Sequence, residues 1–232
     1  MTKFTPLKAA FAASAALTFT ACAQEAAETA APADTPSGAE VTTAAETVVS
    51  EPVTLSIADK VSSGSYVMDT GHGYVTFTYS HMGFSNPQVR FRTIDARMDV
   101  DADNPANSTI SVTIAANSVD TGVDEFDDHL NSVDWLDTAQ FETITFTSTG
   151  LTQADGTTGT VTGDLTMMGI TKPLTLDVTL LAAGDHPVAK VETIGVDATG
   201  IVVRSDYGLG NYAPYVSDEM SVTISGEFNK VE

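Results

Sequence analysis

Cysteine is almost absent from this sequence of 232 residues, in which Cys22 is the only one. A single thiol has no partner for a disulfide within the chain, and no cysteine cluster is present that would bind a metal. The length and the apolar content are those of a globular protein that buries a sizeable core in one domain. Any special role of Cys22 must therefore come from its position near the N-terminus.

Basic residues are also scarce. Ten Lys and Arg stand against thirty-one Asp and Glu, which gives a formal net charge of -21 at pH 7. The electrostatic field of such a chain repels phosphate backbones and anionic membrane surfaces. We therefore expect no nucleic-acid partner. The acidity itself is explained by solubility or by adaptation to a salty medium, and we assign no substrate to it.

Long hydrophobic runs are limited to the N-terminus. An apolar stretch of about thirteen residues from Ala9 to Ala21 follows Lys3 and Lys8, and it is shorter than the roughly twenty residues of a membrane-spanning helix. A basic start, a short apolar run and small residues at its end are typical of a secretory signal peptide. The sequence predicts a signal peptide over residues 1–21 and export from the cytoplasm.

Two processing outcomes remain open at the end of this run. Ala21-Cys22-Ala23 fits a cleavage site that leaves Gln24 as the new N-terminus. Phe19-Thr20-Ala21-Cys22 instead resembles a bacterial lipobox, in which the cysteine is lipidated, although Phe19 stands where leucine is usual. The single cysteine favours lipidation of Cys22. We therefore expect a periplasmic protein that is anchored to a membrane as a lipoprotein.

The composition changes twice after the signal peptide. Residues 22–56 are rich in Ala, Glu, Thr and Pro and contain few large apolar residues, so they cannot bury enough surface to offset their conformational entropy. We interpret them as a disordered tether. Residues 57–232 consist of short alternating segments separated by Gly, Asn, Asp and Pro, and we expect one folded domain there.

The folded region shows the alternation of half-buried β-strands. Val75, Phe77 and Tyr79 fall on one face of a segment whose other face carries Thr and Ser, and His81 takes the next position of the apolar face. Similar one-sided segments continue to the C-terminus. Seven or eight such strands with short turns predict an antiparallel barrel or sandwich. A tight hairpin is expected at Gly169.

One segment departs from this alternation. Within residues 124–133, Phe126, His129, Leu130 and Val133 recur at helical spacing, and Asp124 lies in the first turn, where the helix dipole favours negative charge. This pattern predicts one short amphipathic helix that flanks or plugs one end of the barrel.

No catalytic motif supports an enzyme. The sequence has neither HExxH nor GxSxG, and Ser205-Asp206 beside Arg204 is better explained as a turn with an ion pair than as a nucleophile and its base. A metal site at His72, His81 and His129 would require the fold to bring the three together. We predict no catalytic residues and no metal site. A surface-binding or stress-related assembly protein with a filled barrel remains an alternative, and so does a His-dependent metal or hydrolytic enzyme.

Several motifs together resemble the YceI-like family over about residues 62–231. They are Tyr66-Val67-Met68-Asp69 with His72, Ser80-His81-Met82-Gly83, Asp120-Thr121-Gly122, Asp128-His129-Leu130, Phe146-Thr147-Ser148, the run from Gly163 to Pro173, and Arg204-Ser205-Asp206-Tyr207-Gly208. The resemblance implies an all-β fold, an extended antiparallel eight-stranded lipocalin-like barrel. It also implies an exported protein whose lumen holds a polyisoprenoid, such as an isoprenoid quinone or a prenol, or a similar amphiphile, with no other cofactor.

The candidate ligand contacts are aromatic, sulfur-containing or polar side chains near the expected mouth of the barrel. They are Phe77, Tyr79, His81, Met82, Phe84, Phe91, Trp135, Phe146, Met167 and Met168. Each of them is also compatible with an ordinary core position. His81 is a candidate for a hydrogen bond to a quinone carbonyl or a prenol head group. The oligomeric state stays open, with a homodimer among the alternatives.

Overall fold

The computed structural model describes residues 60–231. The predicted signal peptide at residues 1–21, the lipidation of Cys22 and the tether at residues 22–56 lie outside the described residues. Within residues 60–231, no helix is both long and apolar enough to cross a membrane.

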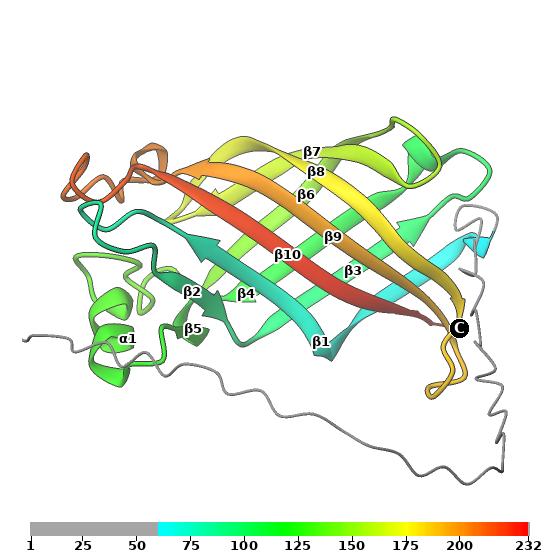
Figure 1. The fold of residues 1–232 in the computed structure, drawn as a ribbon, viewed down its shortest axis with the longest axis horizontal. Coiled ribbons are helices and arrows are strands. Elements are labelled where there is room, and N and C mark those ends of the chain that lie inside the picture. Colours follow the sequence, from blue (N-terminus) through cyan, green and yellow to red (C-terminus); the bar gives the residue numbers. More distant parts are fainter. Residues whose placement is uncertain (1–59, 232) are drawn as a thin grey trace, which may run out of the picture. The chain divides into compact units, whose positions relative to one another are not determined.

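Ten β-strands and one α-helix make up the regular structure of residues 60–231 (Figure 1). The strands are β1 (Gly64–Thr78), β2 (Gln88–Phe91), β3 (Ile94–Val100), β4 (Thr109–Ala115), β5 (Val119–Asp120), β6 (Thr143–Gln153), β7 (Thr158–Met167), β8 (Ile170–Asp185), β9 (Glu192–Val203) and β10 (Glu219–Lys230). The helix is α1 (Asp124–Asn131), and short 3-10 turns lie at Pro105–Asn107, Ala116–Ser118 and Arg204–Tyr207.

Eight of these strands close into an antiparallel barrel. The neighbours run in the order β10, β9, β8, β7, β6, β4, β3 and β1, and β1 also pairs with β10. That closing ladder aligns Met68 with Phe228 and Val75 with Ile224. Closure removes the free edges that an open sheet would present. The predicted all-β fold with an eight-stranded barrel is confirmed.

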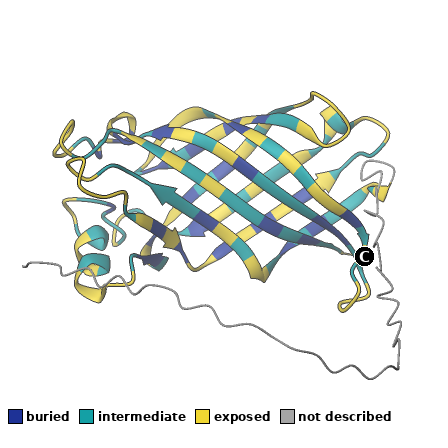
Figure 2. Ribbon diagram, in the orientation of Figure 1, coloured by how far each residue is buried: buried dark blue, intermediate teal, exposed yellow. Residues whose placement is uncertain are grey.

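Burial alternates along the strands, as Figure 2 shows. In β3, Ile94, Ala96 and Met98 are buried, whereas the residues between them are exposed. Successive side chains of a strand point to opposite faces, so one set enters the barrel and the other meets solvent. The two-residue period of the sequence therefore identified the inward face correctly.

The two short strands β2 and β5 continue the sheet beside the second half of β1. Val75 pairs with Phe91 of β2, and Arg90 of β2 pairs with Asp120 of β5. The buried Asp120 carboxylate accepts hydrogen bonds from Arg92 and Arg90 at 2.9 and 2.6 Å. These two guanidinium groups hold the pKa of Asp120 well below its usual range. The ion pairs thereby fix β5 to the corner between β2 and β3.

The hairpin between β7 and β8 turns within two residues. Met168 has a φ of 53° and Gly169 a φ of 71°, and Met167 pairs with Ile170 across the turn. Positive φ at both central positions is the requirement of a type I′ hairpin, which favours glycine. The hairpin predicted at Gly169 is confirmed.

Helix α1 lies at the end of the barrel where β1 ends (Figure 1). Thr121 donates hydrogen bonds from its amide and its hydroxyl to Asp127 at 2.7 and 2.6 Å, which ties the first turns of the helix to the loop before it. The helix ends at Asn131, since the Ser132 amide and hydroxyl both bond to the His129 carbonyl. The prediction that the helix continues to Val133 was wrong, and Val133 is exposed.

Candidate ligand-binding cavity

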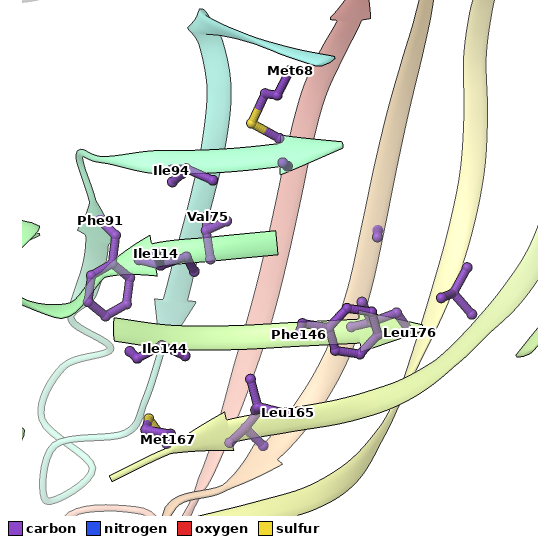
Figure 3. Close-up of a cluster of buried hydrophobic side chains, with 14 of the residues drawn as sticks. Met68, Val75, Phe91, Ile94, Ile114, Ile144, Phe146, Leu165, Met167 and Leu176 are labelled. Atoms are coloured by element: carbon purple, nitrogen blue, oxygen red, sulfur yellow. The ribbon is translucent and has the colours of Figure 1, made fainter. Parts of the chain in front are cut away.

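A cavity of about 860 Å³ lies inside the barrel. Its volume is at the upper end of the range of roughly 300–1,000 Å³ that is typical of small-molecule sites. Figure 3 shows apolar side chains that point into this space from different strands. Each of the eight barrel strands contributes, for example through Val75, Met98, Ile114, Phe146, Leu165, Leu176, Ile194 and Ile224.

The cavity extends along the barrel. At the α1 end its wall includes Phe126, Leu130 and Trp135, whereas at the opposite end it includes Pro105 and Thr157. The second group belongs to the loop before β4 and to the hairpin between β6 and β7. A long, mostly apolar space of this kind fits an extended chain better than a compact ligand.

Eight of the ten predicted contact residues line the cavity. They are Phe77, Tyr79, His81, Met82, Phe91, Trp135, Phe146 and Met167. The alternation that places Val75 and Phe77 of β1 and Tyr79 just after it on one face carries on to His81, so the predicted apolar row faces the lumen. The structure thus places these side chains at the cavity wall, and their contact with a ligand stays a prediction.

Phe84 and Met168 do not line the cavity, contrary to the expectation for these two. Phe84 is 91% exposed, because the chain reverses after His81: the Phe84 amide donates to the His81 carbonyl at 3.0 Å, and Gly83 has a φ of 74°. Met168 occupies the first central position of the β7–β8 turn, where it packs against the core from outside the lining. In both cases a tight turn ends the strand alternation.

Most of the wall that was not predicted as ligand contact is aliphatic. Much of it comes from the inward faces of the last three strands, namely Leu174, Leu176, Val178, Leu180, Ile194, Val196, Ala198, Val202, Val222 and Ile224, together with the aromatic Phe228. The alternation of these strands was visible in the sequence and could have identified them as lining residues. Arg204, which also lines the cavity, gave no such signal, because arginine is seldom buried.

Four aromatic rings form a row at the α1 end. The ring centroids of Phe126 and His129 lie 6.2 Å apart, those of His129 and Trp135 5.6 Å, and those of Trp135 and Tyr212 6.2 Å. All four residues line the cavity. His129 therefore connects the helix to Trp135 through a ring contact, and Trp135 in turn contacts Tyr212.

His81 lies at the same end and is exposed. Its backbone is held by bridges to Ser85 and Val216, and its amide donates to the Ser85 carbonyl at 2.9 Å. Among residues 60–231, the imidazole ring has no hydrogen-bond partner. The ring is therefore free to bind a ligand or water at the cavity wall.

Arg204 is a buried cation at this end, only 4% exposed. Its Nε donates to the Ser217 carbonyl at 2.8 Å, Nη2 donates to the Val216 carbonyl at 2.8 Å, and Nη1 donates to the Leu209 carbonyl. The sequence predicted an ion pair of Arg204 beside Ser205-Asp206. The structure instead shows the turn without that ion pair, and the Ser205 hydroxyl donates to Asp218 at 2.6 Å.

Burial also affects ionisation at this end. Burial lowers the pKa of Arg204, while the nearby charge of Asp218 acts in the opposite direction. Burial raises the pKa of Tyr79, an effect that the positive charge of Arg204 partly opposes. The positive charge of Arg204 would therefore interact with an ionised Tyr79. At neutral pH, Tyr79 is a neutral phenol and Arg204 a charged guanidinium.

The sequence of the described residues matches a known family. The profile of the YceI-like domain matches residues 66–228, and the chain is 38% identical over 156 residues to Protein YceI of Escherichia coli O6:H1, covering 67% of this chain and 81% of the relative.

The chain belongs to the YceI-like family.

Solved structures share the fold of this YceI-like chain. BcnA of Burkholderia cenocepacia superposes with a TM-score of 0.63 at 23% identity, covering 69% of this chain and 98% of the other. A polyisoprenoid binding domain from Saccharophagus degradans superposes with a TM-score of 0.52 at 17% identity, covering 73% of this chain and 100% of the other. At these identities the likeness shows the fold alone.

The outer surface of the YceI-like barrel carries a cluster that could hold a cation. Asp69, His72 and Glu227 each place one ligand atom within 4.8 Å of the others, and His72 Nδ1 lies 2.9 Å from Asp69 Oδ2. The hydrogen bond between them raises the pKa of His72 and lowers that of Asp69. His81 and His129 lie instead at the α1 end, so the described residues do not bring His72, His81 and His129 into one metal site.

A second polar network lies where β1 begins. Glu192 accepts hydrogen bonds from the Ser62 amide at 2.9 Å and hydroxyl at 2.7 Å, the Tyr66 hydroxyl at 2.7 Å and Lys230 Nζ at 3.2 Å. Burial raises the pKa of Glu192, but the hydrogen bonds outweigh it and lower the pKa to about 2. Burial raises the pKa of Tyr66 to about 12. This network joins the start of β1 to β9 and β10.

Proposed function

We propose that this YceI-like barrel binds a polyisoprenoid, such as an isoprenoid quinone or a prenol, or a similar long-chain amphiphile in its lumen. The observation that carries the proposal is the elongated cavity of about 860 Å³ whose wall is built from inward-facing apolar residues of all eight barrel strands. A Saccharophagus degradans domain with the same fold is described as polyisoprenoid binding, which agrees with the proposal.

The energetics favour an apolar chain. Each Å² of apolar surface removed from water contributes about 25 cal/mol, so several isoprene units together offset the entropic cost of association. Met82 and Met167 add flexible, polarisable contacts that adapt to an irregular chain. The wall therefore suits a ligand whose tail supplies most of the affinity.

Binding rather than catalysis accounts for the cavity. The histidines considered for a metal site are separated, and the Ser205 hydroxyl donates to Asp218 rather than to a histidine base. The open lumen also weakens the alternative of a surface-binding protein with a filled barrel. We further propose export and membrane anchoring through Cys22, since a carrier of membrane lipids would work close to a bilayer.

Mass spectrometry tests this proposal on the native protein. The protein is purified from its own host without denaturation, and organic extracts are compared with those of a mock purification. The expected result is a prenyl-chain or other long-chain lipid at near-stoichiometric amount. Extracts that contain no enriched lipid, from protein whose lumen then also fails to take up added prenols, would overturn the proposal.

A further inference from the structure

The guanidinium of Arg204 has donors to spare. A guanidinium carries five N–H groups, and three of them bond to the carbonyls of Leu209, Val216 and Ser217. Among the described residues, the remaining two have no acceptor. Because Arg204 is 4% exposed and lines the cavity, bulk water has little access to them.

No carboxylate within residues 60–231 neutralises this cation by direct contact. The nearest acidic influence is that of Asp218, whose oxygens accept hydrogen bonds from the Ser205 amide at 2.9 Å and the Ser205 hydroxyl at 2.6 Å and none from Arg204. A buried charge without a paired counter-charge is costly in an apolar surrounding. An acceptor that enters the cavity would remove that cost.

The other polar groups of the cavity wall have a definite distribution. Tyr79 and His81 lie at the Arg204 end and, among the described residues, have no side-chain hydrogen bonds. At the opposite end Asp101 and Asp155 line the cavity. Asp155 already accepts backbone amides from Thr157 and Thr158 at 2.8 and 2.7 Å. One end thus carries a guanidinium, a phenol and an imidazole, whereas the other carries two carboxylates together with uncharged side chains such as Thr109 and Gln153.

We propose that the ligand of the lumen carries an acidic head group, a carboxylate or a phosphate, and that Arg204 binds this group while the apolar tail runs toward the Asp101 and Asp155 end. The inference rests on the proposed function and specifies the substrate class of the same site. Tyr79 and His81 add hydrogen bonds to the head group. The acidic residues at the far end disfavour the reversed orientation.

The net charge of -21 does not prevent this selectivity. Surface charges are screened over about 8 Å at physiological ionic strength, whereas a contact inside the barrel is screened much less. The long-range field slows the approach of an anion, but the contact with Arg204 determines how tightly it is held. Charge-assisted hydrogen bonds of this type are stronger than those between neutral groups.

Three probes with the same chain separate the head groups: geranylgeranyl phosphate, geranylgeranoic acid and geranylgeraniol. Each is titrated at neutral pH into the lipid-depleted full chain. We expect at least one acidic probe to bind about tenfold or more tightly than the alcohol, and the comparison of the two acids identifies the preferred anion. Equal affinity for all three probes would overturn the inference but leave the proposed function standing. Binding of none would overturn the proposed function.

Arg204→Met tests the residue, with Arg97→Met as the matched control. Arg97 is exposed on the outer face of β3, so its replacement removes the same charge without touching the cavity. Folded Arg204→Met should bind the acidic probes no more tightly than the alcohol, whereas Arg97→Met should keep the preference. An unchanged preference in folded Arg204→Met would overturn the inference that Arg204 binds the head group.

A measurement on the wild type covers the case in which Arg204→Met fails to fold. Geranylgeranoic acid labelled with ¹³C at the carboxyl is titrated in the complex by NMR. A carboxylate beside Arg204 should keep a pKa below that of the same acid free in solution, whereas an apolar pocket alone would raise it. A raised pKa of the bound ligand would overturn the inference.

Discussion

The rings of Phe77 on β1 and Phe91 at the end of β2 lie with their centroids 5.8 Å apart and their planes tilted by 40°. Both side chains line the cavity, and they meet where the second half of β1 pairs with β2. The wall at this point consists of two tilted aromatic rings. Polar substitutions here therefore test the lumen directly.

Phe77→Asp should weaken binding of a long-chain prenol at least tenfold. The substitution places a carboxylate without a partner against apolar walls, and such a group either drives the ligand out or becomes protonated at a cost. Titration with geranylgeraniol measures the loss, and circular dichroism shows that the barrel remains folded.

Thr175→Asp is the matched control for this change. Thr175 is exposed on the outward face of β8, next to the inward Leu176, and lies outside the cavity lining. Thr175→Asp introduces the same residue, aspartate, into another strand of the barrel. Equal losses in folded Phe77→Asp and Thr175→Asp would contradict binding in the lumen.

His81→Leu should reduce the difference in affinity between an isoprenoid quinone and a hydrocarbon of equal chain length. A buried hydrogen bond contributes about 1 kcal/mol net, less than several buried isoprene units, so the dependence on chain length should persist. Titration of both proteins with both ligands measures the change. An unchanged head-group preference would make His81 an ordinary wall residue.

Acid should weaken the fold through Glu192. Its folded pKa is depressed from 4.5 to about 2, so its contribution to stability is present above about pH 4.5 and is lost as the pH falls toward 2. The Glu192 side chain is 21% exposed, and after allowance for solvent screening the shift corresponds to about 2 kcal/mol of unfolding free energy. Urea unfolding followed as the pH falls below about 4.5 measures this loss.

Glu192→Gln isolates that contribution from the many other carboxylates. The variant should be less stable than the wild type at neutral pH, and the difference between the two proteins should shrink as the pH falls below about 4.5. A difference that stays constant over this range would show that ionised Glu192 adds nothing to stability.

Cys22 should carry the membrane anchor. If the lipobox is used, the intact mass of the mature protein includes a diacylglycerol group and the chain begins at Cys22. Cys22→Ser should then release the protein from the membrane fraction. Soluble wild-type protein that begins at Gln24 would show cleavage without lipidation.

The sequence predicted the features that depend on local alternation. The inward row Val75, Phe77 and Tyr79, the hairpin at Gly169 and the helix beginning at Asp124 all follow from spacing between near neighbours. Each of them is present in the structure. The eight-stranded barrel and the polyisoprenoid ligand class were inferred from resemblance to a family rather than from this local pattern.

Positions that depend on turns or distant contacts could not be predicted. Phe84 is an aromatic residue close to the apolar row of β1, so its sequence position suggested a ligand contact. The turn at Gly83 instead directs its side chain to solvent. Arg204 is buried because carbonyls at residues 209, 216 and 217 surround it. Those contacts form only once the loop after β9 has folded back, and no periodicity in the sequence reports them.

Affinity as a function of chain length tests the central claim most directly. Prenols of increasing length with an identical hydroxyl head are titrated into the lipid-depleted protein. If the chain lies in the lumen, affinity should rise with each added isoprene unit until the cavity is filled and then level off. Affinity that does not depend on chain length would contradict the claim that the lumen holds the ligand.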